Sequence, residues 1–139
     1  MSRARNRSAA ATVATTRSSK LRVELAPVPA ARPRVSKWGT YYTGTYKRWL
    51  KDADAAIPEA EVTWQGNLSV TLDLVADKPK TTKRDNPRGD IDNYIKAVLD
   101  ALTKKRYWND DDQIVHLYAH KRWPNPTEVP HFTVRIEQA

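Results

Sequence analysis

Carboxylates gather at two places in a chain that is otherwise basic. Asp90 and Asp92 stand two residues apart at the predicted start of a helix, and Asp110, Asp111 and Asp112 follow about one helix and one turn later. If the turn folds back toward that start, both groups meet at one place. Like charges repel, so carboxylates gathered in space need a cation. With no cysteine and three histidines, the available ligands are hard oxygens, which favour Mg²⁺ or Mn²⁺.

A metal ion beside basic loops suits phosphodiester cleavage. The ion lowers the pKa of a bound water and neutralises charge that develops on the reacting phosphate. Lys96 follows Asp92 by four residues, so the two side chains share one face of the predicted helix. A fixed cation at that position could stabilise the transition state or help to position the nucleophile.

The same residues also have ordinary structural explanations, and the spacing alone does not decide between them. Asp90 and Asp92 could cap the helix and complement its dipole. Asp92 and Lys96 could form an i,i+4 ion pair worth roughly 0.2–0.5 kcal/mol, which Asp100 would extend as a solvated or salt-bridged position. The run of aspartates could be a polar turn.

The basic residues predict a polyanionic partner. Lys and Arg number 24 against 16 Asp and Glu, which gives a net charge of +8, and nucleic acid is the commonest polyanion. Two proline-containing loops hold the candidate DNA-binding residues, which are Arg32, Arg34 and Lys37 in the first and Lys78, Lys80, Lys83, Arg84 and Arg88 in the second. The alternative is a solvated run of charge, but the second loop leads directly into Asp90, which favours DNA contact.

Length and composition predict one domain with a basic tail. The chain has 139 residues and no cysteine, which excludes disulfides, thiolate nucleophiles and zinc sites built on sulfur. No stretch approaches the roughly 18 apolar residues of a membrane span, so we expect a cytoplasmic protein without membrane contact. Residues 1–20 hold five basic and no acidic residues, which predicts a disordered tail, with a transit peptide as the competing interpretation. Residues 21–139 would form the domain.

Hydrophobic periodicity predicts an α+β fold, with a mixed sheet packed against helices. Alternating apolar residues predict strands near 21–25, 68–74, 114–122 and 132–136. Helical spacing predicts one helix from Tyr42 to Ile57, ended by Pro58, and a second over residues 90–105. The long second helix would lie on one face of the sheet. Residues 27–39 are expected to form an extended basic loop.

The two acidic motifs together resemble the RusA family of Holliday junction resolvases. RGDIDNYIKAVLDAL followed by YWNDDDQIV is similar to the family pattern D-x-D-N-x-x-K-x-x-x-D-x-L and then D-D-x-Q-[VI]. The strong resemblance covers about residues 88–122, and PVPAARPRVSKWGTYYT is a looser match to a proline-rich segment of the family. The matching residues are Asp90, Asp92, Asn93, Lys96, Asp100, Leu102, Asp110, Asp111, Gln113 and Ile114.

The resemblance implies a RusA-like fold and a metal-dependent endonuclease that cuts four-way DNA junctions as a homodimer, by paired symmetric nicks in DNA recombination and repair. It places the catalytic and metal-binding carboxylates at Asp90, Asp92 and Asp111 and the family lysine at Lys96. The triple aspartate also leaves Asp112 open as the third ligand, although counting back from Gln113 selects Asp111. Asp110 would then be a supporting residue. A phage or bacterial origin is implied by the resemblance alone.

Several flanking residues keep two interpretations. Asn93 could orient a carboxylate or cap the helix, and Gln113 could hydrogen-bond the acidic turn or simply end it. The aromatic residues near the first basic loop, Trp38, Tyr41 and Tyr42, could stack on exposed bases or pack in the core. Trp108 is expected in the core. His116 and His120 are expected to face the surface or DNA rather than a metal.

Two other functions remain open on the sequence. The first is a nuclease of the same chemistry that acts on flaps or other branched DNA. The second is a non-catalytic basic DNA-binding module, in which the aspartates are only helix caps.

Overall fold

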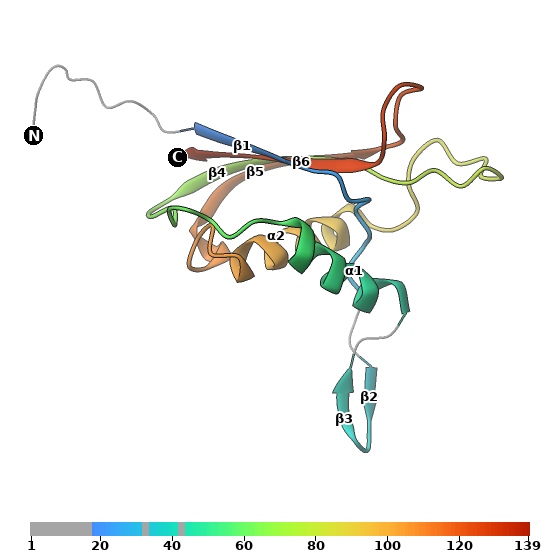
Figure 1. Cartoon of the computed structure of the whole chain (residues 1–139), viewed down its shortest axis with the longest axis horizontal. Helices are drawn as coiled ribbons and strands as arrows, with labels where there is room; N and C mark the ends of the chain where they lie inside the picture. Colours follow the sequence, from blue (N-terminus) through green and yellow to red (C-terminus); the bar gives the residue numbers. More distant parts are fainter. Residues whose placement is uncertain (1–17, 32–33, 42–43) are drawn as a thin grey trace, which may run out of the picture.

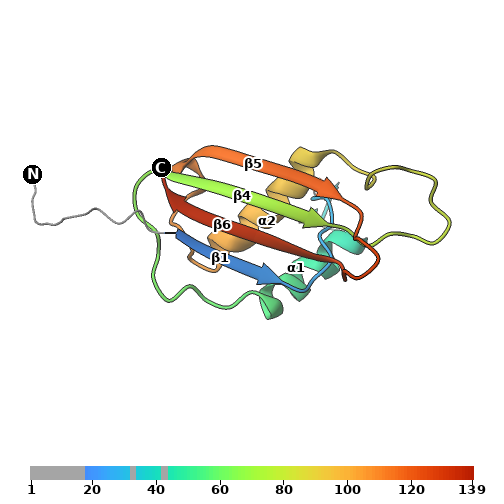
Figure 2. The same ribbon diagram turned by 90° about the horizontal axis from the view of Figure 1, so that it is seen from above.

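A four-stranded mixed sheet forms the framework of the protein. The computed structural model describes residues 18–31, 34–41 and 44–139. The strands lie in the order β1-β6-β4-β5, and they are β1 (Ser18–Val23), β6 (His131–Gln138), β4 (Leu68–Val75) and β5 (Ile114–Arg122). β6 pairs antiparallel with both β1 and β4, whereas β4 and β5 are parallel. β5 therefore forms one edge of the sheet, as Figure 2 shows.

The parallel pair depends on a helix between its strands. α2 (Ile91–Lys104) lies between β4 and β5 in the chain, as a parallel connection requires a long crossover. Alternate residues of β4 are fully buried, including Leu68, Val70 and Leu72, while the residues between them are half-buried. This period of two places one face of β4 on the helices and the other toward solvent.

Both long helices cover the same face of the sheet. α1 (Gly44–Ala56) and α2 lie side by side beneath the strands (Figures 1 and 2). The core lies in this layer, where Trp49, Leu102 and Phe132 are buried. Trp108 is also buried at 1% exposure, as the sequence predicts. The arrangement confirms the predicted α+β class with a mixed sheet packed against helices.

Three predicted boundaries differ from the structure. β1 begins at Ser18, so the last three residues of the expected tail pair with β6, and residues 1–17 lie outside the described part of the chain. Cross-strand pairing gives Ser18–Lys20 an order that their composition does not predict. Leu25 falls outside the strand. α1 begins at Gly44 rather than at Tyr42, and Tyr42 is outside the described residues.

The expected extended loop over residues 27–39 contains a short hairpin instead. β2 (Arg34–Ser36) and β3 (Gly39–Tyr41) pair antiparallel. The turn between them is made by Lys37 and Trp38, and Gly39 follows with φ +125°, a conformation that favours glycine. Each strand has only three residues, too few for an alternating pattern to be recognised in the sequence.

Candidate active site

The first acidic segment lies at the entrance to α2. Asp90 is the N-cap residue and has an extended backbone, with φ −72° and ψ 140°. Its carboxylate makes no side-chain cap hydrogen bond, so the capping interpretation of Asp90 does not hold. Asp92 follows in the first turn, and both side chains are exposed. The pair is therefore accessible from solvent.

Two side chains hold the backbone immediately before Asp90. The Lys121 ammonium of β5 donates to the carbonyl oxygens of Pro87 at 2.7 Å and Gly89 at 2.5 Å. The Tyr94 hydroxyl donates to the intervening carbonyl of Arg88 at 2.7 Å. Burial raises the pKa of Tyr94, against an opposing effect of the Arg84 charge, so the hydroxyl keeps its proton. Three consecutive carbonyls are thus fixed, and their contacts set the direction in which the chain enters α2.

The proline-rich segment after β1 packs against the same entrance. The Ala30 amide donates to the Asn93 carbonyl at 2.9 Å. Gly89 has φ +104°, and a Cβ atom there would lie 3.1 Å from Cγ of Pro29. Only glycine adopts this positive φ and allows the close approach of Pro29 without strain. The entrance to α2 is therefore held from two sides, by β5 and by residues 29–30.

The second acidic segment is a self-capped turn. η1 (Asp111–Gln113) follows Asp110, whose carboxylate accepts a hydrogen bond from the Asp112 amide at 3.0 Å. The Gln113 side-chain oxygen accepts from the Asn109 and Asp110 amides. Its amide nitrogen donates to the carbonyls of Trp64 and Gly66 at 3.1 and 3.0 Å. Gln113 therefore anchors the turn as well as ending it, and the carboxylate of Asp110 is engaged in the turn.

Asp111 lies in the electrostatic field of α2. Burial raises the pKa of Asp111, as do hydrogen bonding to Asp110 and the negative charges of Asp110 and Asp100, while the Lys96 charge acts in the opposite direction. Lys96 forms an ion pair with Asp100 at 3.2 Å. The structure thus brings Asp111 together with Lys96 and Asp100. The sequence predicts a structural position for Asp100, which its ion pair with Lys96 supports. The i,i+4 series 92–96–100 also indicates a further acid on this face of the helix.

The structure does not bring Asp90, Asp92 and Asp111 into one ready-made cluster. Across residues 18–31, 34–41 and 44–139, no three His, Cys, Asp or Glu side chains are grouped closely enough to hold a metal ion. The acidic turn lies near Lys96 and Asp100 of α2, and Asp92 precedes Asp100 by about two turns, which is about 12 Å along the helix axis. In chemical type the residues fit a hard cation, because they are exposed carboxylates and the pKa of Asp111 is raised by burial and by neighbouring acids. Shared coordination would require the two segments to move closer.

The second basic loop projects from the sheet beside the entrance to α2. Residues 77–89 connect β4 to α2 and extend past the strand ends (Figures 1 and 2). The predicted DNA-binding side chains of this loop are exposed, and they are Lys78, Lys80, Lys83, Arg84 and Arg88. The Trp123 indole donates to the Arg84 carbonyl at 2.9 Å and ties the loop to the segment after β5. In the first loop, Lys37 is exposed, Arg34 belongs to β2, and Arg32 lies outside the described residues.

The two histidines of β5 do not contribute to a metal cluster within the described chain. His120 contacts Asp73 at 2.9 Å. Arg122 completes this group, because it pairs with Asp73 at 3.1 Å and with Glu128 at 2.6 Å. The residues tie the ends of β4 and β5 to the segment before β6.

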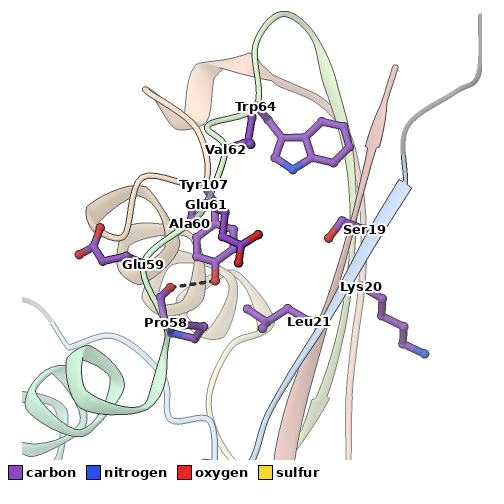
Figure 3. Close-up of a pocket in the computed structure, with 10 residues that line it drawn as sticks. All are labelled: Ser19, Lys20, Leu21, Pro58, Glu59, Ala60, Glu61, Val62, Trp64 and Tyr107. Atoms are coloured by element: carbon purple, nitrogen blue, oxygen red, sulfur yellow. Dashed lines mark hydrogen bonds between the residues drawn. The ribbon is translucent and has the colours of Figure 1, made fainter.

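A cavity of about 360 Å³ lies elsewhere, between β1 and residues 58–64. Figure 3 shows its lining, in which the Tyr107 hydroxyl donates to the Pro58 carbonyl at 2.8 Å. None of the predicted site residues lines this cavity. The chemistry suggested by the aspartates is therefore separate from it.

Within the described chain, no helix is long and apolar enough to cross a bilayer.

Comparison with known proteins places these features in a family. The family model described as endodeoxyribonuclease RusA matches residues 24–137. A protein of Lactococcus phage r1t, named crossover junction endodeoxyribonuclease rusA, is 42% identical to this chain over 55 residues. That match covers 39% of this chain and 42% of the phage protein. The family model extends from the segment before β2 into β6 and includes both acidic segments with the basic loop. The chain belongs to the RusA family of endodeoxyribonucleases.

Proposed function

We propose that this protein is a metal-dependent endodeoxyribonuclease that resolves four-way DNA junctions by paired symmetric nicks. The observation that carries the proposal is the RusA family match over residues 24–137, because it includes both acidic segments and the basic loop beside them. The name of the phage relative supports junction DNA as the substrate. A phage relative also fits a protein that acts on DNA inside a bacterial host.

The carboxylates of Asp90, Asp92 and Asp111 are the proposed ligands for Mg²⁺, with Mn²⁺ as an alternative. The bound ion would supply an activated water and neutralise charge on the phosphate. Asp111 supports this assignment, because burial and neighbouring acids raise its pKa and a bound cation would favour its charged form. Asp112, whose amide donates to Asp110 within the turn, is the alternative third ligand.

The remaining groups have separate tasks. Lys96, whose charge acts on Asp111, would stabilise negative charge on the phosphate. Asn93, Asp110 and Gln113 support the two acidic segments through their backbone and side-chain contacts. The basic loop over residues 77–89 would bind DNA phosphates, which positions a duplex without reading its sequence. Two nicks placed symmetrically require two active sites, so a twofold homodimer is part of the proposal.

The test compares four-way junction, flap and linear duplex as substrates with Mg²⁺ present. We expect junction cleavage by the unmodified protein, and its loss with EDTA or in Asp92→Asn, while Asp92→Asn still binds the junction. Asp52→Asn is the matched control, because Asp52 is an exposed aspartate on α1. Activity that survives both EDTA and Asp92→Asn would contradict the metal site. Equal cutting of linear duplex would contradict junction selectivity, and preferential cutting of flaps would favour the flap nuclease instead.

A further inference from the structure

The β2–β3 hairpin presents an unburied tryptophan at a distance from the body of the protein. Trp38 is 86% exposed and Val35 is 82% exposed. Figure 1 shows the hairpin projecting away from both the sheet and the helices. The alternative that Trp38 packs in the core therefore does not hold. An apolar side chain of this size in water gains stability when a partner covers it, since burial of aromatic surface is favourable.

The tip of the hairpin is ordered by its own contacts. The Ser36 hydroxyl donates to the Gly39 carbonyl at 3.3 Å and accepts from the Trp38 amide at 3.1 Å. The Lys37 ammonium lies 5.0 Å from the centre of the Trp38 ring, within the range of a cation–π contact. The tip thus combines an aromatic face with a positive charge.

The base of the hairpin is attached to the candidate active site. Residues 29 and 30, which precede β2 by only a few residues, contact Gly89 and the Asn93 carbonyl at the entrance to α2. A strand of three residues is about 10 Å long at roughly 3.3 Å per residue. That length equals about three base steps of a duplex, at roughly 3.4 Å each. Trp38 follows Ala30 by eight residues, which is at most about 28 Å of extended chain, so DNA bound at Asp90 and Asp92 would extend into the range of the tip.

We propose that Trp38 stacks on an unstacked base next to the branch point of the DNA substrate. This inference rests on the proposed function and deepens it. Charge favours DNA as the occupant, because the hairpin contains Arg34 and Lys37 and no acid, in a chain of net charge +8. An indole stacks on any base, with a contribution of about 1–3 kcal/mol. A continuous duplex offers no such base, so the contact adds selectivity for branched DNA.

The test measures binding of the protein to a four-way junction in EDTA, which stops the proposed cleavage. The fluorescent base 2-aminopurine is placed at the branch point as the probe. Trp38→Ala should weaken junction binding by about 5- to 150-fold, which is the stacking contribution converted at 1.4 kcal/mol per factor of ten, and should abolish quenching of the probe. Trp38→Phe should restore most of both. Binding of linear duplex should not change. Val62→Ala is the matched control, since Val62 is exposed on a segment outside the hairpin.

Unchanged junction affinity and quenching in Trp38→Ala would overturn the proposal. An equal loss on linear duplex would also overturn it, because the contact would then not depend on unstacked bases. Loss of dimer in sedimentation, with DNA binding by the remaining dimer intact, would show that the hairpin meets a second copy of the chain instead. A failure of the proposed function is distinct, because the unmodified protein would then show no preference for junctions.

Discussion

The two acidic segments are positioned in different ways. The segment before α2 is held by side chains that are distant in sequence, with Lys121 donating to two carbonyls and Pro29 packed on Gly89. The turn at 110–113 is held largely from within, by Asp110 and Gln113. The position of Asp90 therefore depends on tertiary packing, and that of Asp111 depends mainly on local capping. Substitutions that weaken the support of each segment should therefore differ in their effects on stability and cleavage.

The largest effect is expected from Lys121→Met, which keeps the length of the side chain and removes its three donors. The carbonyls of Pro87 and Gly89 lose their partner, at a cost of about 1–3 kcal/mol in the free energy of unfolding. Displacement of Asp90 should lower the rate of junction cleavage by about a hundredfold, since misplacement by about 1 Å has this consequence. Single-turnover cleavage with saturating enzyme measures the rate apart from binding.

Lys121→Arg serves as the control, because it keeps the charge and should recover part of the rate. Cleavage unaffected by Lys121→Met would show that the entrance to α2 does not need its distant partner, and the contrast between the segments would fail.

A smaller effect is expected from Gln113→Ala. The change removes the capping of the acidic turn and its link to Trp64 and Gly66, which should lower the free energy of unfolding in urea by about 1–2 kcal/mol. Cleavage should fall by about tenfold, less than for a full 1 Å misplacement of a catalytic group, because Asp110 still caps the turn. Gln65→Ala is the matched control, because Gln65 is exposed and donates only to the nearby Thr63 carbonyl. A loss in Gln113→Ala that equals the loss in Lys121→Met would show that the link to Trp64 and Gly66 matters as much to the turn as its own capping.

The pKa of Asp111 tests whether the acidic turn responds to changes in its own segment and not to changes at Asp92. The raised pKa of Asp111 means that the charged form is disfavoured in the folded state, so this group lowers stability as the pH rises through its folded pKa. Asp110→Asn should bring the pKa of Asp111 back toward its ordinary value, as followed by NMR titration. Asp92→Asn, which alters the other segment, should leave it unchanged. An equal shift in both variants would mean that the two segments are already coupled without a cation.

The smallest effect concerns the end of β5 near Lys121. Hydrogen bonds from Arg122 lower the pKa of Glu128 to about 2, so the pair stabilises the fold above about pH 4.5 and this contribution is lost as the pH falls toward 2. Glu128→Gln should lower thermal stability at pH 7 and remove the further loss that the unmodified protein shows between about pH 4.5 and 2. If junction cleavage at pH 7 falls as well, the support of Asp90 extends beyond Lys121 into this ion-pair group.

Much of the fold could be predicted because apolar residues recur at clear periods along its strands and helices. β4 alternates strictly, and α2 has an apolar stripe with acids near its start. The β2–β3 hairpin is too short for such a signal. In the site, the spacing of Asp90, Asp92 and Asp111 indicates candidate ligands. No sequence pattern indicates the role of Lys121. A lysine in a strand near the surface has no distinguishing local pattern, and only the packing of β5 against α2 gives Lys121 two backbone carbonyls and the Tyr94 ring as partners.

The position of the acidic turn along α2 could also not be predicted from the sequence. A helix and a turn of given lengths allow the chain to return toward either half of the helix. The structure returns it to the part of α2 around Lys96 and Asp100. The register of β5 on β4, in which Ile114 after the turn pairs with Leu68, is likewise not specified by any local pattern.

β5 begins directly after the acidic turn and carries Lys121 near its other end. A single strand therefore connects the supports of both acidic segments. Its partner β4 is parallel, so the pair cannot form until α2 and the chain around it have been closed into a crossover. Contacts between distant parts of a chain form slowly. In refolding from urea, junction cleavage should thus return with the slowest step of sheet formation, after helical signal has already recovered.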